Sequence, residues 1–96
     1  MLQHKKIKIE KKTVEAILFN LTGKSLIVIK GSRGYVMCGY LNLRAAEKFR
    51  DVAVKITGVA TINEALRATV ASCTSQARKL GIHKGQRVKD VLKVIA

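Results

Sequence analysis

Residues 26–40 have the sequence LIVIKGSRGYVMCGY, and this stretch decides the fold of the chain. Two runs rich in β-branched and aromatic residues flank a Gly-Ser-Arg-Gly turn, a pattern that predicts a β-hairpin. The first run is apolar at every position from 26 to 29, which is typical of a strand that is covered on both faces. The stretch therefore predicts a strand pair at the centre of a sheet.

Further strand signals lie on both sides of this hairpin. Residues 5–10 alternate charged and apolar side chains, as expected of a strand with one face in water. Residues 13–21 are apolar on both faces, and Thr22-Gly23 forms a turn before residue 26. Short turns between successive runs favour an antiparallel meander of four strands, followed by a fifth strand. The predicted strands are residues 5–10, 13–21, 26–29, 35–41 and 52–56.

Helix signals dominate the second half. Asn42 is a predicted N-cap for a short helix over residues 43–50. Residues 61–64 (TINE) form a capping box, which predicts a long helix from residue 62 to Leu80, closed by Gly81 as a left-handed cap. Residues 86–95 predict a last helix. The fold class expected is α+β: a mostly antiparallel sheet of about five strands packed with two main helices.

The apolar character of the middle strands raises the question of what covers the second face of the sheet. Either the helices divide between the two faces, or a second subunit covers one of them. Large bare apolar patches are rare on monomers, so a homo-oligomer is expected.

The charge of the chain is strongly positive. Nineteen Lys and Arg against six Asp and Glu give a net charge of +13, which favours polyanionic partners such as nucleic acid. The alternative is a solvated surface that keeps the protein soluble. No aromatic residue lies among the basic residues of the last third, so contact with phosphates without base readout is expected. The predicted anion-binding residues are Arg78, Lys79, Lys84, Arg87, Lys89 and Lys93, together with the N-terminal lysines.

A second hypothesis places a small-ligand or enzymatic site at the hairpin. Cys38 is the weak candidate nucleophile, with Lys30 and Arg33 as cations nearby; the alternative is that Cys38 is a small buried apolar residue. Gly31 and Gly34 have the G-x-x-G spacing with which KH domains hold a nucleic-acid backbone. The alternative is a tight turn in which both glycines have positive φ.

Several classes of protein are disfavoured. No apolar run approaches the ~20 residues that span a bilayer, and the polar start does not resemble a signal peptide. Cys38 and Cys73 are not in a CxxC pair, and the acidic residues are few, so no metal site and no cofactor are expected. An enzyme has few candidate groups. We expect a cytoplasmic protein with reduced thiols.

A family resemblance supports this interpretation. The runs Val28-Ile29-Lys30-Gly31 and Gly34-Tyr35-Val36-Met37-Cys38-Gly39 resemble the central signature of the YunC-like family, small bacterial and archaeal proteins with a domain of unknown function. Segments 58–62 and 81–85 are also similar. The resemblance implies a compact α+β fold and supplies no activity or ligand. We therefore expect one α+β domain over residues 1–96, with a lysine-rich N-terminal strand (1–12) and a YunC-like region (13–96).

The function expected from the sequence is that of a non-catalytic binding module for polyanions. Two alternatives stay open: a small-ligand or enzymatic site around Cys38 and residues 30–34, and a structural oligomer that acts as a scaffold.

Overall fold

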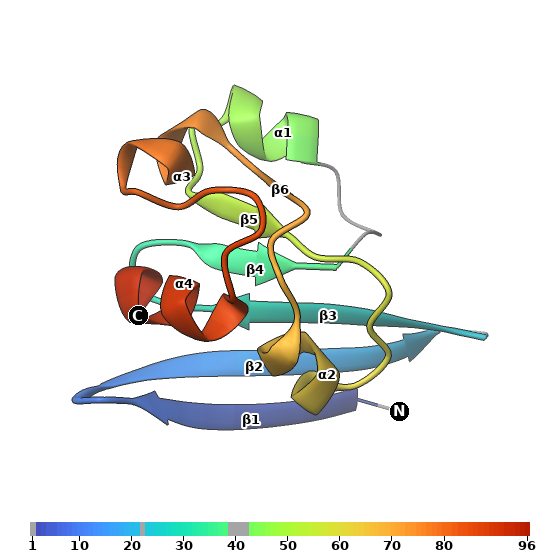
Figure 1. Cartoon of the computed structure of the whole chain (residues 1–96). Coiled ribbons are helices and arrows are strands. Elements are labelled where there is room, and N and C mark those ends of the chain that lie inside the picture. The colour runs from blue at the N-terminus through green and yellow to red at the C-terminus, as the bar shows by residue number, and fades with distance from the viewer. Residues whose placement is uncertain (1, 22, 39–42) are drawn as a thin grey trace.

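The computed structural model describes residues 2–21, 23–38 and 43–96. Within these residues, six strands form one sheet in the order β1-β2-β3-β4-β5-β6, and there are four short helices (Figure 1). Helix α1 lies between β4 and β5, α2 between β5 and β6, and α3 and α4 follow β6. None of the helices in the described part of the chain has the length and apolar character to cross a membrane. The elements are β1 (Leu2–Ile9), β2 (Lys12–Leu21), β3 (Lys24–Lys30), β4 (Tyr35–Met37), α1 (Leu43–Lys48), β5 (Ala53–Lys55), α2 (Ile62–Arg67), β6 (Ser72–Cys73), α3 (Ser75–Lys79) and α4 (Val88–Ile95).

The predicted α+β class and the antiparallel meander are confirmed. Strands β1 to β4 pair antiparallel in chain order, with Ile17 of β2 opposite His4 of β1 and Val28 of β3. Strand β5 runs parallel to β4, and the sixth strand, β6, pairs antiparallel with β5. Strand β4 begins at Tyr35 as predicted; residues 39–41 of the predicted strand and the expected N-cap Asn42 lie outside the described residues.

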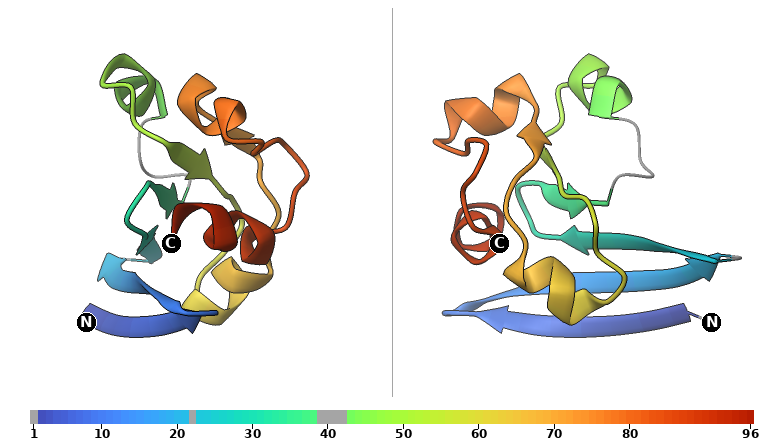
Figure 2. Two further views of the ribbon diagram at one scale, coloured as in Figure 1. Left: turned by 90° about the vertical axis from the view of Figure 1, so that its left-hand side faces the viewer. Right: turned by 45° about the vertical axis from the view of Figure 1, so that its right-hand side comes forward.

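The main core lies on one face of the sheet. In β2 the side chains of Val14, Ala16 and Leu18 are buried, whereas the residues between them are exposed, as the two-residue period of a strand requires. The last helix, α4, which the sequence predicts, covers this face with its buried residues Val88, Val91, Leu92 and Ile95. Figure 2 shows α2, α3 and α4 on this side and α1 on the other.

The opposite face is covered only in part. Helix α1 packs over β4 and β5, where Met37, Ala46 and Ala53 form a small second core. Among the described residues, no helix lies over the β1–β3 part of this face, and Ile17 and Phe19 are 39% and 43% exposed. The helices therefore do divide between the two faces, yet they leave an apolar strip on one of them.

The predicted long helix from 62 to 80 is wrong. Helix α2 ends at Arg67, and Ala68 has extended backbone angles. The Val70 and Ala71 amides then donate to the carbonyls of Gln86 and Lys55, at 2.9 Å in both cases, which draws the chain to the edge of the sheet. Helical propensity is a weak preference that such tertiary hydrogen bonds override. Ile62, Cys73 and Ala77 are nevertheless buried, but they lie on three separate elements, α2, β6 and α3.

Of the three predicted helix caps, the capping box at Thr61 and the glycine cap at Gly81 are confirmed. Thr61 Oγ accepts from the Glu64 amide, and the Glu64 carboxylate accepts from the Thr61 amide, which is the reciprocal pattern of a capping box. Gly81 has φ +92° and follows α3. Its amide donates to Arg78 O and the Ile82 amide to Ala77 O, the pair of bonds that defines a Schellman motif.

The explanation of the hairpin glycines by positive φ is wrong. The described glycines with positive φ are Gly23, Gly58, Gly81 and Gly85, and neither hairpin glycine is among them. A Cβ on Gly31 would lie 2.2 Å from the carbonyl oxygen of Ile95, and one on Gly34 would lie 2.3 Å from that of Val52. Close approach of neighbouring backbones, and not turn conformation, is what requires glycine here.

Candidate functional site

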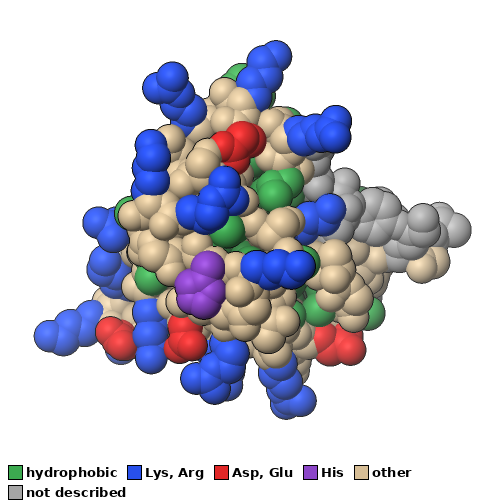
Figure 3. Space-filling view, turned by 45° about the horizontal axis from the view of Figure 1, so that its top comes forward, with side chains coloured by type: hydrophobic (Ala, Val, Ile, Leu, Met, Phe, Trp, Pro, Cys, Tyr) green, Lys and Arg blue, Asp and Glu red, His purple; other side chains and the backbone are tan. Residues whose placement is uncertain are grey.

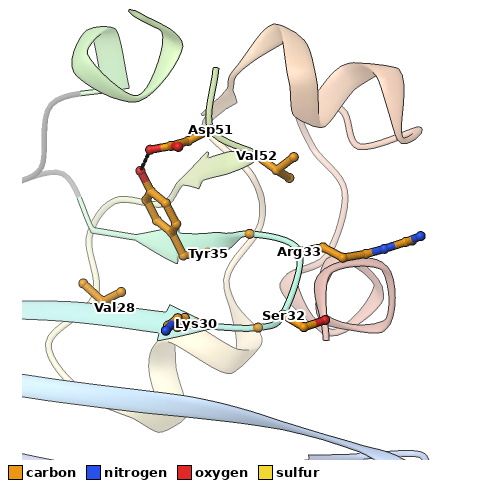
Figure 4. Close-up of a pocket in the computed structure, with 9 residues that line it drawn as sticks. Val28, Lys30, Ser32, Arg33, Tyr35, Asp51 and Val52 are labelled. Carbon is orange, nitrogen blue, oxygen red and sulfur yellow. Dashed lines mark hydrogen bonds between the residues drawn. The ribbon is translucent and has the colours of Figure 1, made fainter. Parts of the chain in front are cut away.

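A hollow of about 530 Å³ opens beside the 31–34 turn. Its walls come from the end of β3, the turn itself, the start of β4 and the segment Asp51-Val52 that precedes β5. The predicted hairpin residues Lys30, Gly31, Arg33 and Gly34 all line it (Figure 4).

The polar centre of this hollow is a pair that sequence analysis did not single out. The Tyr35 hydroxyl donates a 2.9 Å hydrogen bond to Asp51 Oδ2. Burial first, and then this bond and the negative charge of Asp51, raise the pKa of Tyr35 to about 12. The phenol is therefore protonated at neutral pH, where it holds the carboxylate and does not act as a base.

The two cations of the hairpin are placed differently. Lys30 is the register partner of Tyr35, so both side chains project from the same face of the sheet. Figure 4 shows the Arg33 side chain directed away from Tyr35 and Asp51. Lys30 is therefore the cation that shares the hollow with the Tyr35–Asp51 pair.

The turn is held by the last residues of α4. The Arg33 amide donates to Ile95 O at 2.8 Å, and Ser32 Oγ donates to Ala96 O at 3.0 Å. Within the turn, the Gly31 amide donates to Gly34 O at 2.8 Å. These bonds and the close packing of both glycines give the hollow a backbone wall with defined hydrogen bonds.

Cys38 does not line this hollow. It is 3% exposed, its Sγ accepts from the Ile27 amide at 3.4 Å, and its thiol is directed at Ser25 O. Cys73 is also buried, with its thiol directed at Ile82 O. The histidines lie elsewhere: His4 is exposed on β1, and His83 is exposed in the loop before α4. Within the described residues, no three His, Cys, Asp or Glu side chains are grouped to hold a metal ion.

Three of the six predicted basic residues line two hollows on the helix side. Lys84 lines a hollow of about 640 Å³ together with Arg67, at the end of α2. Lys89 and Lys93, one helical turn apart on α4, line a groove of about 280 Å³ with Lys8 of β1. Helix α2 contributes to both hollows, through Arg67 in the first and Leu66 in the second.

The other predicted cations have protein partners or lie apart. Arg87 is 3.4 Å from Asp90, and Arg78 donates to Cys73 O at 2.9 Å. Arg78 and Lys79 lie in the last turn of α3 and line neither hollow. Figure 3 shows Lys and Arg side chains distributed over the whole of the visible face, with few Asp or Glu among them.

The sequence analysis did not predict three residues of these hollows, Tyr35, Asp51 and Arg67, because no local sequence pattern indicates that they belong to a site. Tyr35 and Asp51 are 16 positions apart and meet through the parallel pairing of β4 with β5. Parallel strands are joined by a long crossover segment and not by a tight turn, so no turn sequence predicts which strands pair. Arg67 was assigned to the middle of a long helix, whereas it ends a short one.

Comparisons with known proteins agree with this architecture. The model of the family described as "Domain of unknown function (DUF1805)" matches residues 37–95. The uncharacterised protein YunC of Bacillus subtilis is 32% identical in an alignment of 90 residues that covers 90% of this chain and 89% of YunC. The crystal structure of TA1206, a protein of unknown function from Thermoplasma acidophilum, superimposes with a TM-score of 0.96 at 36% identity, covering 100% of this chain and 94% of TA1206. The chain therefore belongs to the DUF1805 family, the family of YunC.

Proposed function

We propose that this protein is a non-catalytic module that binds polyanions, with nucleic acid as the expected partner. The observation that supports this most is the position of Lys84, Lys89 and Lys93 beside open hollows of the helix side. Among the described residues, none of these three lysines takes part in an ion pair. Their charges are therefore available to phosphates.

The charge balance supports the same function. A net charge of +13 attracts anions over long distances, and each phosphate that a lysine or arginine neutralises releases bound counterions. Arg67 next to Lys84, and Lys8 next to Lys89 and Lys93, extend both groups of cations. In the part of the chain that the structure describes, no aromatic side chain lines either hollow, so contacts to phosphate without base reading are expected.

The expected result of a fluorescence anisotropy titration is binding that weakens steeply with salt. The logarithm of the affinity should fall with the logarithm of salt concentration by about 0.9 for each phosphate contacted in a labelled duplex. The double variant Lys89→Gln/Lys93→Gln should lower this slope by about 2, and Arg67→Gln/Lys84→Gln by a similar amount.

The matched control is Lys48→Gln/Arg50→Gln, which removes the same charge near α1 on the other side of the sheet. An equal loss of slope in this control would show that net charge, and not the helix side, is responsible. No binding of duplex or single strand at about 150 mM salt would contradict the proposal itself.

We also propose that a second copy of this chain covers the open β1–β3 face. One row of register partners across the three strands consists of Leu2, Phe19 and Leu26. The next row of this face, toward α1, contains Ile17 and Val28. A neighbouring row, Lys6-Glu15-Lys30, alternates in sign, so a two-fold partner can place each Glu15 against Lys6 of the other copy.

Self-association should depend on this face. Sedimentation of the wild-type chain should show an oligomer, and its melting temperature should rise with protein concentration. Ile17→Asp/Phe19→Asp should give monomers, since it puts charges into the apolar rows. Phe49→Asp is the control, because Phe49 is 72% exposed and lies just after α1. A monomeric wild-type chain, or dissociation by the control as well, would contradict this assembly.

A further inference from the structure

The hollow beside the 31–34 turn has the composition of a small-molecule site. Its volume of about 530 Å³ lies within the range of ligand pockets, about 300–1,000 Å³. Two valines and two glycines line it, together with five polar side chains: Lys30, Ser32, Arg33, Tyr35 and Asp51. Because Arg33 is directed away from Tyr35 and Asp51, Lys30 is the cation beside that pair. A few convergent polar groups on an apolar floor are what fix the orientation of a bound small molecule.

The cation of this hollow has no partner in the described chain. Glu15 is opposite Lys30 on β2, but its carboxylate lies 3.7 Å from His4 and forms no ion pair with Lys30. Lys30 thus presents an ammonium group, with three hydrogen-bond donors, to an incoming anion. A carboxylate or a phosphate would satisfy it.

Only one oxygen of the Asp51 carboxylate accepts a hydrogen bond from the described residues. Asp51 Oδ2 accepts from the Tyr35 hydroxyl, and no other hydrogen bond of the Asp51 side chain is found among the described residues. An ionised carboxylate accepts at both oxygens. Because the Tyr35 phenol stays protonated, the pair retains one negative charge, which favours a cationic group or a hydroxyl on the ligand.

The two charges together select the class of ligand. A simple anion attracted to Lys30 would be repelled by Asp51, and a simple cation attracted to Asp51 would be repelled by Lys30. We propose that this hollow binds a small zwitterion, with its carboxylate or phosphate on Lys30 and its ammonium group on Asp51. The ligand's carbon chain would lie on Val28 and Val52.

The wall of the hollow is preorganised for this role. The turn is tied to Ile95 and Ala96 by the hydrogen bonds of Arg33 and Ser32, and its glycines pack directly on neighbouring backbone. A wall held in this way loses little conformational entropy when a ligand binds. The proposal does not rest on polyanion binding, which involves the other side of the sheet.

A chain-length series of ω-amino acids tests the proposal: glycine, β-alanine, γ-aminobutyrate, δ-aminovalerate and ε-aminocaproate. Each would be titrated into ¹⁵N-labelled protein while the amide resonances of Gly31, Gly34 and Tyr35 are followed. One length should bind best, and it should bind about tenfold or more tightly than the carboxylate and the amine of the same length.

Two variants should separate the two charges. Lys30→Met should abolish the preference for the zwitterion over the plain amine, and Asp51→Asn its preference over the plain carboxylate. Lys12→Met removes the same charge outside the hollow and should leave binding unchanged. The proposal is overturned if no member of the series shifts these resonances, if the singly charged analogues bind equally well, or if Lys12→Met weakens binding as much as Lys30→Met. Nucleic-acid affinity of Lys30→Met should stay close to that of the Lys12→Met control, so failure here and failure of polyanion binding can be told apart.

Discussion

Replacement of Gly31 by alanine is expected to lower the free energy of unfolding by about 3 kcal/mol, in the range of severe overpacking. The added Cβ would lie 2.2 Å from the carbonyl oxygen and 2.6 Å from the carbonyl carbon of Ile95, and 2.9 Å from the Ala96 nitrogen. All three are backbone atoms, so no side-chain rotation relieves the contact. The turn and the end of α4 must move apart, which also weakens the Arg33 amide bond to Ile95.

The control for Gly31→Ala is Gly58→Ala. Gly58 has φ +72° and open space where its Cβ would be, so alanine there costs about 1 kcal/mol of backbone strain without a clash. Chemical denaturation of both variants measures the difference. Equal stability of the two variants would contradict the close packing of the turn against α4.

Replacement of Thr74 by valine is expected to destabilise the fold by a similar amount, roughly 3 kcal/mol, because it leaves buried polar groups without partners. Thr74 is fully buried. Its hydroxyl donates to Asp51 O at 2.7 Å and accepts from the amides of Ala53 and Ala77, at 3.1 and 3.3 Å. One side chain thus joins the start of β5, the segment that carries Asp51, and the first turn of α3.

Thr74→Ser is the matched control, since serine keeps the hydroxyl and removes only a methyl group, at a cost of about 1 kcal/mol. Thermal or denaturant unfolding of both variants gives the comparison. A valine variant no less stable than the serine variant would show that the three hydrogen bonds contribute little. Because Thr74 holds the backbone of Asp51, Thr74→Val should also shift the amide resonance of Tyr35 in the folded state.

The functional residues illustrate where sequence reasoning succeeds. Lys30, Gly31, Arg33 and Gly34 were predicted as one group because a tight hairpin brings neighbours in sequence together, and all four line the same hollow. The reason given for the glycines was wrong, since their backbone conformation is ordinary and the constraint comes from Ile95 and Val52. Ile95 and Val52 are distant from the turn in sequence, so the sequence pattern of the turn does not predict these contacts.

The sequence by itself determined the elements whose local signal is not overridden by contacts with distant segments. The alternation of residues 5–10, the capping box at Thr61 and the helix signal of residues 86–95 all correspond to observed elements, because each depends on neighbours within a few positions. Only the tertiary structure decided the break of the predicted long helix and the pairing of Tyr35 with Asp51. Strand β5 is responsible for both features. The helix is interrupted because Ala71 and Cys73 pair with the edge of β5, and Asp51 meets Tyr35 because β5 pairs parallel with β4. Those hydrogen bonds join distant segments, and their energy outweighs the local preference for helix.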